Sequence, residues 1–219
     1  MSAALRAPGL ASLGIAHGFG TREAPVPAGL RRPRQVHGAR VLRVEEPGPE
    51  LLAEADAVLC RVPGLPVGVV TADCIPILAA SRSGRVVAAI HAGWRGLAAG
   101  VIGQALAALR AAAAGEELVA ALGPHVGPCC YEVDEPVLRA LDGCFPELRA
   151  RATRRSRRGH VWLDLGLVAR AQLQRAGVAN PTPLAEVCTA CHPERFFSVR
   201  REGPDTGRLV HWIAARPSL

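Results

Sequence analysis

Cys74 and His91 lie in two apolar runs rich in β-branched residues, which flank a polar turn at residues 81–84. This pattern predicts two buried strands joined as a hairpin. If the ends of the turn face each other, Cys74 stands directly opposite His91, with their Cβ atoms about 4.5 to 5.5 Å apart on one face. A thiolate and an imidazole at that separation can share one tetrahedral zinc ion, with bonds of about 2.3 Å and 2.0 Å. Pro76 cannot donate to a ladder, so it implies an edge or a bulge that could shift the pairing by one residue.

His37 is the third candidate metal ligand, and it is expected at the end of a strand that breaks at Gly38. The spacing of His37, Cys74 and His91 is too long for a local chelate pattern, so the fold must bring them together. Three protein ligands of this kind leave the fourth position of a zinc ion open for water or substrate, which is the catalytic arrangement. Such an ion would keep Cys74 as a thiolate and lower the pKa of its bound water. The simpler alternative is a buried cysteine and two ordinary histidines at strand ends.

The other cysteines form two further patterns. Residues 188–192 read Cys-Thr-Ala-Cys-His, which matches the c-type haem attachment motif. Covalent haem attachment normally takes place outside the cytoplasm, and the first residues show no export signal, so an ordinary loop is favoured over haem or zinc. Cys129 and Cys130 are adjacent, and because a vicinal disulfide is strained, we expect two reduced thiols.

Length and composition limit the possible classes of protein. The 219 residues can bury a substantial core without disulfides and are expected to form one domain over residues 1–219. Hydrophobic residues make up 49% of the chain and aromatic residues only 4%, so Ala, Val and Leu build the core. No apolar run is long enough to span a bilayer without a charge, which predicts a cytoplasmic protein without a membrane partner. Seven cysteines in such a chain indicate free thiols, metal ligands or a nucleophile.

The formal net charge of +7 raises the question of nucleic-acid binding, because basic surfaces bind phosphate backbones. All 26 basic residues are Arg, however, which attributes much of the charge to a coding bias. The densest basic run, residues 149–158, has no interleaved aromatic residue that could stack on bases. A solvated loop is therefore favoured over a nucleic-acid contact.

The expected elements alternate between strands and helices. Strands are expected at residues 15–22 and 118–122, with a closing hairpin at 196–200 and 209–214, and helices at 97–113, 134–143 and 164–177. Asp134 and Asp164 are the expected N-caps, and Gly177 is the expected residue after the last helix. The pattern predicts an α/β fold with mixed sheets. The first helix starts close to His91, so its N-terminal N–H groups and Arg95 form a natural anion site.

Seven segments, in order along the chain, resemble one protein family: HGFGTR, RQVHGARV, TADCIPIL, HAGWRGLAAGVI, LGPHVGPCCYEV, DLGLVARAQLQRAGV and CTACHPERFFSVRRE. They are similar to the laccase-domain or YfiH-type proteins, now regarded as purine nucleoside phosphorylases. The similarity covers most of the chain, and TADC followed by HAGWRG is highly specific. It implies a single-domain, layered α/β/β/α sandwich. It also implies a catalytic zinc ion held by the histidines and cysteine of RQVHG, TADC and HAGWRG, which are His37, Cys74 and His91 here.

The resemblance implies phosphorolysis of adenosine, inosine, guanosine and methylthioadenosine to the free base and ribose 1-phosphate, together with adenosine deamination. The partners are then a purine nucleoside and phosphate, and the protein is a monomer or a homodimer. Arg95, Arg200 and Arg22 match arginines expected to contact phosphate or ribose, although each could instead form a structural ion pair. Asp73 is expected to orient a neighbouring group at the catalytic site rather than act as a base. The segment between Arg22 and Arg34 is shorter than usual in the family and could form one wall of the pocket.

Three alternatives to this function remain open. The older family name implies copper-dependent phenol oxidation, but none of the seven histidines forms a His-x-His pair and the only Met is the initiator, which favours zinc over copper. A cysteine hydrolase or deamidase could use Cys74 as nucleophile and His91 as base, since an opposed pair suits that geometry. A zinc-stabilised binding module without catalysis is the third alternative, although candidate ligands beside an anion-binding helix start indicate an open site.

Overall fold

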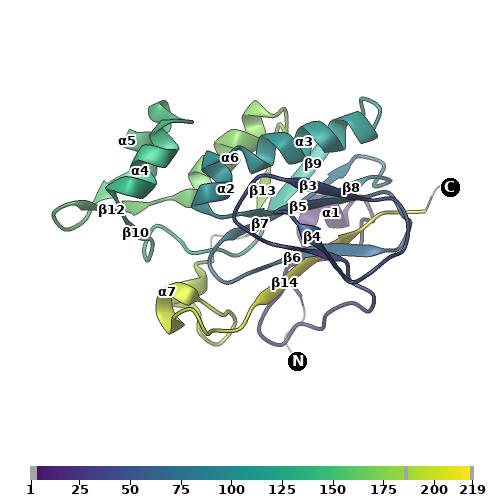
Figure 1. Cartoon of the computed structure of the whole chain (residues 1–219), viewed down its shortest axis with the longest axis horizontal. Coiled ribbons are helices and arrows are strands. Elements are labelled where there is room, and N and C mark those ends of the chain that lie inside the picture. Colours follow the sequence, from purple (N-terminus) through teal and green to yellow (C-terminus); the bar gives the residue numbers. More distant parts are fainter. Residues whose placement is uncertain (1–3, 185–186, 218–219) are drawn as a thin grey trace.

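A mixed sheet of six strands forms the centre of the molecule, in the order β13–β9–β7–β8–β5–β3 (Figure 1). The strands are β3 (Val41–Val44), β5 (Ala57–Cys60), β7 (Ile75–Ser81), β8 (Val87–Ala92), β9 (Leu118–Leu122) and β13 (Thr182–Pro183). The β3–β5 and β9–β13 pairs are parallel, and the other pairs are antiparallel. The structure is a computed structural model, and it describes residues 4–184 and 187–217.

Helices cover one face of this sheet (Figure 1). They are α2 (Trp94–Ala98), α3 (Val101–Ala112) and α6 (Leu165–Arg175). Side chains along β7 alternate between the two faces, and Ile75 and Ile77 belong to one buried cluster with Ile102 and Leu106 of α3. The buried positions of α3 recur at the spacing of one helical face, which explains why this face lies against the sheet.

A smaller antiparallel sheet covers the opposite face. It contains β1 (His17–Gly18), β14 (Leu209–Ala214) and β6 (Pro66–Thr71), in the order β1–β14–β6. Val69 and Ile213 of this sheet share a second buried cluster with Leu78 and Val87 of the large sheet, and helix α1 (Pro8–Ala11) adds Leu10. Helices, large sheet and small sheet thus form successive layers, which confirms the predicted α/β class with mixed sheets.

Smaller elements surround this centre. Strands β2 (Arg32–Arg34) and β4 (Leu51–Glu54) form a parallel pair, and β10 (Glu132–Asp134), β12 (His160–Leu163) and β11 (Thr153–Arg155) form an antiparallel sheet. The other helical segments are α4 (Glu135–Asp142), η1 (Pro146–Leu148), α5 (Arg149–Ala152), η2 (Thr189–Cys191) and α7 (Val199–Glu202). Among the described residues, no helix combines the length and apolar character that crossing a membrane requires.

The register of β7 and β8 differs from the predicted one. His91 pairs with Pro76 instead of Cys74, because the turn is wider than expected and Ser81 N–H bonds to the carbonyl of Val86 at 2.9 Å. Cys74 lies in the bend immediately before β7. Since the partner has moved by two residues, an even number, Cys74 and His91 still belong to the same face of the sheet.

Pro76 marks neither an edge nor a bulge, contrary to the prediction. It lies in β7, between β8 and β9, and the pairing of β7 with β8 is continuous. Pairing with β9 starts only at the next residue, Ile77, which faces Leu122. The proline therefore lies one residue before the pairing with β9 begins, and its carbonyl accepts a hydrogen bond from Gly123 N–H at 2.8 Å.

Three other predicted elements differ from the structure. The helix expected over residues 97–113 is divided into α2 and α3 at Gly100, whose φ of 79° lies in the left-handed region. Residues 196–200 lead into α7 instead of forming a strand, because the Ser198 side chain accepts a hydrogen bond from Arg201 N–H at 3.3 Å and caps that helix. The basic run at residues 149–158 is not a plain loop, since it contains α5 and β11 and buries Ala152.

Other predicted elements are confirmed. Strand β9 has the predicted bounds, and β14 occupies the predicted residues 209–214. Asp164 caps α6 by accepting a hydrogen bond from Leu167 N–H at 2.8 Å, and Gly177 follows the helix with a φ of 84°. Helix α4 follows Asp134 as expected, although the Asp134 side chain makes no cap hydrogen bond.

Candidate metal centre and substrate cavity

His37, Cys74 and His91 converge at one end of the large sheet. They come from the turn between β2 and β3, the bend before β7 and the end of β8, and their ligand atoms all lie within 4.8 Å of one another. Cys74 Sγ is 4.0 Å from His37 Nε2, and the two imidazole rings are 4.8 Å apart at an angle of 80°. His91 is buried, Cys74 is half-buried and His37 is exposed, so the cluster is reachable from solvent on one side.

Asp56 holds two of these three residues in place. Its Oδ1 lies 2.7 Å from His91 Nδ1, which leaves Nε2 of that ring for a ligand. The same carboxylate accepts hydrogen bonds from the backbone N–H groups of Val36, His37 and Gly38, at 3.2, 2.9 and 2.7 Å. Burial would raise the pKa of Asp56, but His91 and the N–H groups of Gly38 and Val36 lower it, so the group is a carboxylate. A carboxylate behind a histidine is the usual support of a metal-ligating imidazole.

The backbone around the three candidate ligands has two special features, a close approach at Gly93 and two residues with positive φ angles. A Cβ atom added to Gly93 would lie 3.0 Å from Cys74 Sγ and 3.1 Å from His37 Cδ2. His37 and Asp73 have φ angles of 59° and 102°, in the region that favours glycine. Such conformations cost about 1 to 3 kcal/mol each and concentrate at functional sites. The three N–H bonds to Asp56 offset this cost in the turn that carries His37.

The thiol and the buried imidazole are a coupled acid–base pair. Burial would raise the pKa of Cys74, but its interactions with His37 and His91 lower it to about 6. Burial would lower the pKa of His91, but Asp56 and Cys74 raise it to about 9. Cys74 is therefore a thiolate at neutral pH, the form that binds metals or acts as a nucleophile. Metal binding at Nε2 of His91 requires the loss of a proton there.

The chemistry of the three candidate ligand atoms indicates which metal these residues fit. Two imidazole nitrogens and one thiolate are borderline-soft ligands, which suit zinc and disfavour magnesium or calcium. The Asp56 carboxylate and the space kept open at Gly93 support the same interpretation. With three protein ligands, a fourth position would remain for water or substrate.

A cavity of about 940 Å³ opens beside the three residues. Five arginines line it: Arg32, Arg34, Arg95, Arg200 and Arg208. Tyr131 and Trp94 add aromatic surface. A cavity with this charge and these rings can hold a ligand that has both an anionic group and a flat apolar ring system.

The structure places Arg95, Arg200 and Asp73 at the cavity but not Arg22. Arg95 lies over the Trp94 ring at 4.3 Å, and Arg200 lies 5.1 Å from the Tyr131 ring. Arg22 lies outside the cavity lining, where it is paired with Glu202, donates to the carbonyl of Phe196 at 3.2 Å and stacks 4.3 Å from the Phe197 ring.

Asp73 has both carboxylate oxygens engaged. Oδ1 accepts from the Thr189 hydroxyl and Oδ2 from Arg200 N–H, each at 2.6 Å. The side chain is nearly inaccessible to solvent. The carboxylate therefore joins the segment around η2 to the first turn of α7.

Sequence reasoning missed Asp56, Tyr131 and the outer arginines of the cavity. A usable signal existed for Asp56, since it is an acid directly before the apolar run 57–60 and must find a partner once buried. Nothing in the sequence indicated that this partner would be His91. Arg32, Arg34 and Arg208 offered no local signal, because they reach the cavity only through the packing of β2 and the segment before β14.

Residues 21–216 match the family described as "Multi-copper polyphenol oxidoreductase laccase", and the chain belongs to this family. The predicted membership is thereby confirmed. The purine nucleoside phosphorylase of Xylella fastidiosa (strain 9a5c) is 41% identical over 177 residues, which cover 77% of this chain and 66% of that protein. This chain thus spans slightly less than two thirds of that relative's length.

Two further proteins are similar to the chain. A protein named adenosine deaminase RL5, from an unknown prokaryotic organism, is 35% identical over 195 residues, covering 84% of this chain and 74% of that protein. The crystal structure of YlmD from Geobacillus stearothermophilus matches with a TM-score of 0.84 and 28% identity, over 96% of this chain and 94% of that chain.

Proposed function

We propose that this chain is a purine nucleoside phosphorylase with a zinc ion held by His37, Cys74 and His91. It would convert adenosine, inosine, guanosine or methylthioadenosine, with phosphate, to the free base and ribose 1-phosphate. The observation that carries the proposal is the three-ligand cluster at the wall of a cavity lined by five arginines. Relatives bearing the name purine nucleoside phosphorylase support it.

Each group around the cluster then has a defined task. A zinc ion bound there would supply a Lewis acid and lower the pKa of a bound water. Asp56 keeps His91 in the tautomer with Nε2 available, and it fixes the turn of His37. Asp73 accepts a hydrogen bond from the backbone N–H of Arg200, which fixes the backbone position from which the Arg200 side chain extends at the cavity wall.

The arginines support the phosphorolysis step. A phosphate oxygen attacks C1′ of the ribose while the bond from C1′ to the purine nitrogen breaks, and the base leaves with the bonding electron pair and takes up a proton. Arg95 and Arg200 would hold the phosphate by charge-assisted hydrogen bonds close to C1′. Arg22 would not contact phosphate, because it lies outside the cavity lining and holds the segment that leads into α7.

Adenosine deamination is the second candidate activity, favoured by the relative named adenosine deaminase. In that reaction water adds to C6 of the purine and ammonia leaves, so no phosphate is consumed. The same cavity could serve both reactions, and only the products distinguish them.

Product analysis tests the proposal. Metal-quantified protein is incubated with adenosine, with and without phosphate, and the products are separated by chromatography. Adenine and ribose 1-phosphate should form only with phosphate, and Cys74→Ala should abolish them. Cys144→Ala is the matched control, because the Cys144 thiol lies outside the cluster and bonds to the carbonyl of Ala98. Inosine formed without phosphate would make deamination the main activity, and the absence of all products would contradict both activities and favour a cysteine hydrolase or a binding module.

A further inference from the structure

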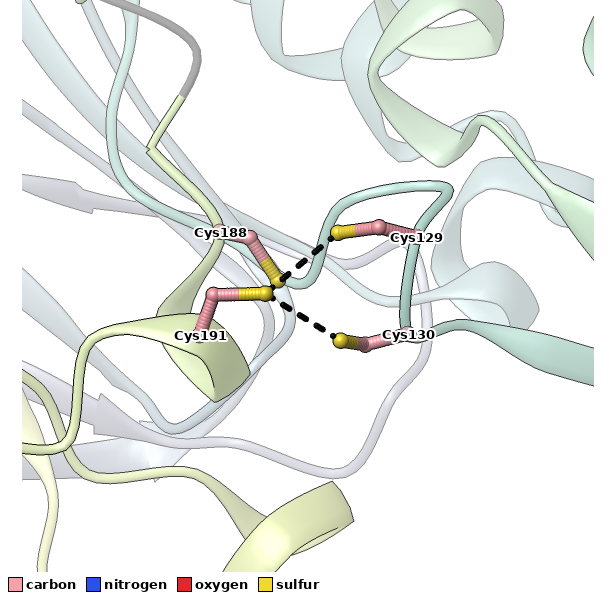
Figure 2. A group of neighbouring side chains, drawn as sticks. All are labelled: Cys129, Cys130, Cys188 and Cys191. Carbon is pink, nitrogen blue, oxygen red and sulfur yellow. Dashed lines mark hydrogen bonds between the residues drawn. The ribbon is translucent and has the colours of Figure 1, made fainter.

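Four cysteine thiols gather at a second place, where two segments far apart in the sequence meet (Figure 2). Cys129 and Cys130 lie in the loop between β9 and β10, and Cys188 and Cys191 lie at η2. All four Sγ atoms lie within 4.8 Å of one another. Figure 2 shows that the side chains from the two segments point toward each other. No member of this cluster is a ligand candidate of the centre at His37.

The sulfur separations fit a shared metal ion. Cys191 Sγ lies 3.6 Å from Cys129 Sγ and 3.4 Å from Cys130 Sγ. A tetrahedral site with zinc–sulfur bonds of about 2.3 Å places its sulfurs roughly 3.8 Å apart, whereas a disulfide needs about 2.05 Å. One sulfur can pair with only one partner in a disulfide, yet Cys191 is near two. The arrangement is therefore closer to a four-thiolate site than to two disulfides.

Backbone contacts hold the two cysteine segments close together. Cys188 Sγ accepts a hydrogen bond from Gly127 N–H at 3.2 Å, an interaction that stabilises a thiolate. A Cβ atom at Gly127 would lie 3.1 Å from Cys188 Cβ and 3.4 Å from Cys129 Sγ, so the close approach of the loops depends on this glycine. Cys191 N–H donates to the carbonyl of Cys188 at 3.2 Å, and this turn brings the first and fourth residues of a Cys-x-x-Cys segment together.

A positive charge lies against the same turn. Arg201 Nη1 donates to the carbonyls of Thr189 and Ala190, at 2.8 and 3.0 Å. The same guanidinium is paired with Glu202 at 2.7 Å, so Arg201 supports the cluster by fixing the two carbonyls of the turn. His192, the last residue of the haem-like motif, instead lies 3.4 Å from Glu194 and is not a member of the thiol cluster.

We propose that Cys129, Cys130, Cys188 and Cys191 bind a structural zinc ion through four thiolates. Four zinc–sulfur bonds form as four thiol protons pass to solvent, and no electron is transferred. The site is closed, because the protein fills all four coordination positions. It is separate from the proposed catalytic centre, and its existence does not depend on the proposed function.

The proposed ion would fix part of the cavity wall. Thr189, between the two cysteines of the second segment, donates its hydroxyl to Asp73, the residue before Cys74. Tyr131 directly follows Cys130 and lines the cavity. Joining the two segments through one ion therefore holds both Thr189 and Tyr131, which explains why a structural site lies at this junction.

Zinc content measured by elemental analysis and native mass spectrometry tests the proposal. Protein purified without chelator and under reducing conditions should hold two zinc ions per chain, and Cys144→Ser should hold two as well. Cys74→Ser and Cys191→Ser should each hold one. After exchange for Co²⁺, the ion left in Cys74→Ser should show much stronger thiolate-to-cobalt charge-transfer absorption than the ion left in Cys191→Ser, because four thiolates bind the first ion and only Cys74 binds the second.

Three results would overturn the proposal. The first is Cys74→Ser protein without zinc but with all four thiols reduced. The second is a disulfide among the four cysteines, mapped by mass spectrometry after alkylation of protein prepared without oxygen. The third is iron and acid-labile sulfide in place of zinc. Because the wild-type and Cys74→Ser measurements leave the four cysteines intact, the test stands even if Cys191→Ser does not fold.

Discussion

Asp56 Oδ1 lies 2.7 Å from Nδ1 of His91, in a pair that is almost completely buried. The same carboxylate binds three consecutive backbone N–H groups of the turn that carries His37. One side chain therefore sets the ring orientation of one candidate ligand and the backbone of another. The candidate metal centre is built around this carboxylate as much as around the three candidate ligands.

Asp56→Asn should weaken zinc binding at the His37 centre. An amide removes the negative charge behind His91 and cannot accept all the bonds of the carboxylate, so we expect zinc affinity to fall about 10- to 100-fold. Competition with a chelator measures this. Asp134→Asn is the matched control, because the Asp134 side chain makes no cap hydrogen bond. Equal zinc affinity in Asp56→Asn and the wild type would show that the carboxylate is not part of the centre.

Gly93→Ala should disturb the centre with little loss of fold. The added Cβ would press on Cys74 Sγ at 3.0 Å and His37 Cδ2 at 3.1 Å, so we expect phosphorolysis to fall at least about 10-fold while overpacking costs about 1 to 3 kcal/mol. Enzyme assay and urea unfolding measure the two effects. Gly103→Ala in α3 meets nothing within 4 Å and should keep full activity. Full activity in Gly93→Ala would contradict the role assigned to this close approach.

Arginine variants should distinguish the residues that contact phosphate from the one that only stabilises the fold. Loss of a charge-assisted hydrogen bond costs about 1.5 to 3 kcal/mol, so Arg95→Ala and Arg200→Ala should raise the KM for phosphate about 10- to 100-fold. Arg200→Ala keeps the backbone bond to Asp73, which limits the change to the guanidinium. Arg22→Ala should lower the unfolding midpoint and leave this KM unchanged, because Arg22 contacts Glu202 and Phe196 outside the cavity. Steady-state kinetics with varied phosphate would refute this division if Arg22→Ala raised the KM as much as the other two.

Acid should destabilise the fold through His211. Burial, with the charge of His91, lowers the pKa of His211 to about 3, and its Nδ1 accepts a hydrogen bond from Gly20 N–H at 3.2 Å. A histidine with a lowered folded pKa binds its proton only after unfolding, so its contribution is complete above pH of about 6.5 and is lost as the pH falls toward 3.

The expected loss from His211 is about 2 kcal/mol between pH 7 and pH 5. Urea unfolding of the wild type and His211→Gln at both pH values measures it. The difference in unfolding free energy between the two proteins should shrink by this amount at the lower pH, since other titrating groups are common to both. A difference independent of pH would show that His211 is not held neutral in the fold.

Local signals predicted the elements whose hydrogen bonds are local. The Asp164 cap, Gly177 and the bounds of β9 follow from residues within a few positions of one another. The shared face of Cys74 and His91 was also predictable, because the alternation of a strand survives a shift of two residues. The register of β7 and β8 was not predictable, because the turn between them extends beyond the polar residues 81–84 and closes at Val86.

Contacts between distant segments were beyond sequence reasoning. The Asp56–His91 bond joins two strands, and the four-cysteine cluster joins the loop after β9 to the segment around η2. Considered alone, Cys129 and Cys130 favoured two reduced thiols, and the Cys-x-x-Cys segment favoured an ordinary loop over haem or zinc. Only the fold brings the two pairs of cysteines together, and no spacing rule relates segments so far apart.

Removal and return of zinc tests the central claim most directly. Wild-type and Cys74→Ala proteins are stripped with a chelator, reloaded with zinc, and assayed for adenine and ribose 1-phosphate formed from adenosine and phosphate. We predict that stripped wild-type protein is inactive and that zinc restores both products in equal amounts. Cys74→Ala should stay inactive after the same zinc treatment, even when its four-cysteine site is filled to the same extent as in the wild type. Phosphorolysis that continues in stripped protein, or that zinc restores in Cys74→Ala, would contradict a catalytic centre at His37, Cys74 and His91.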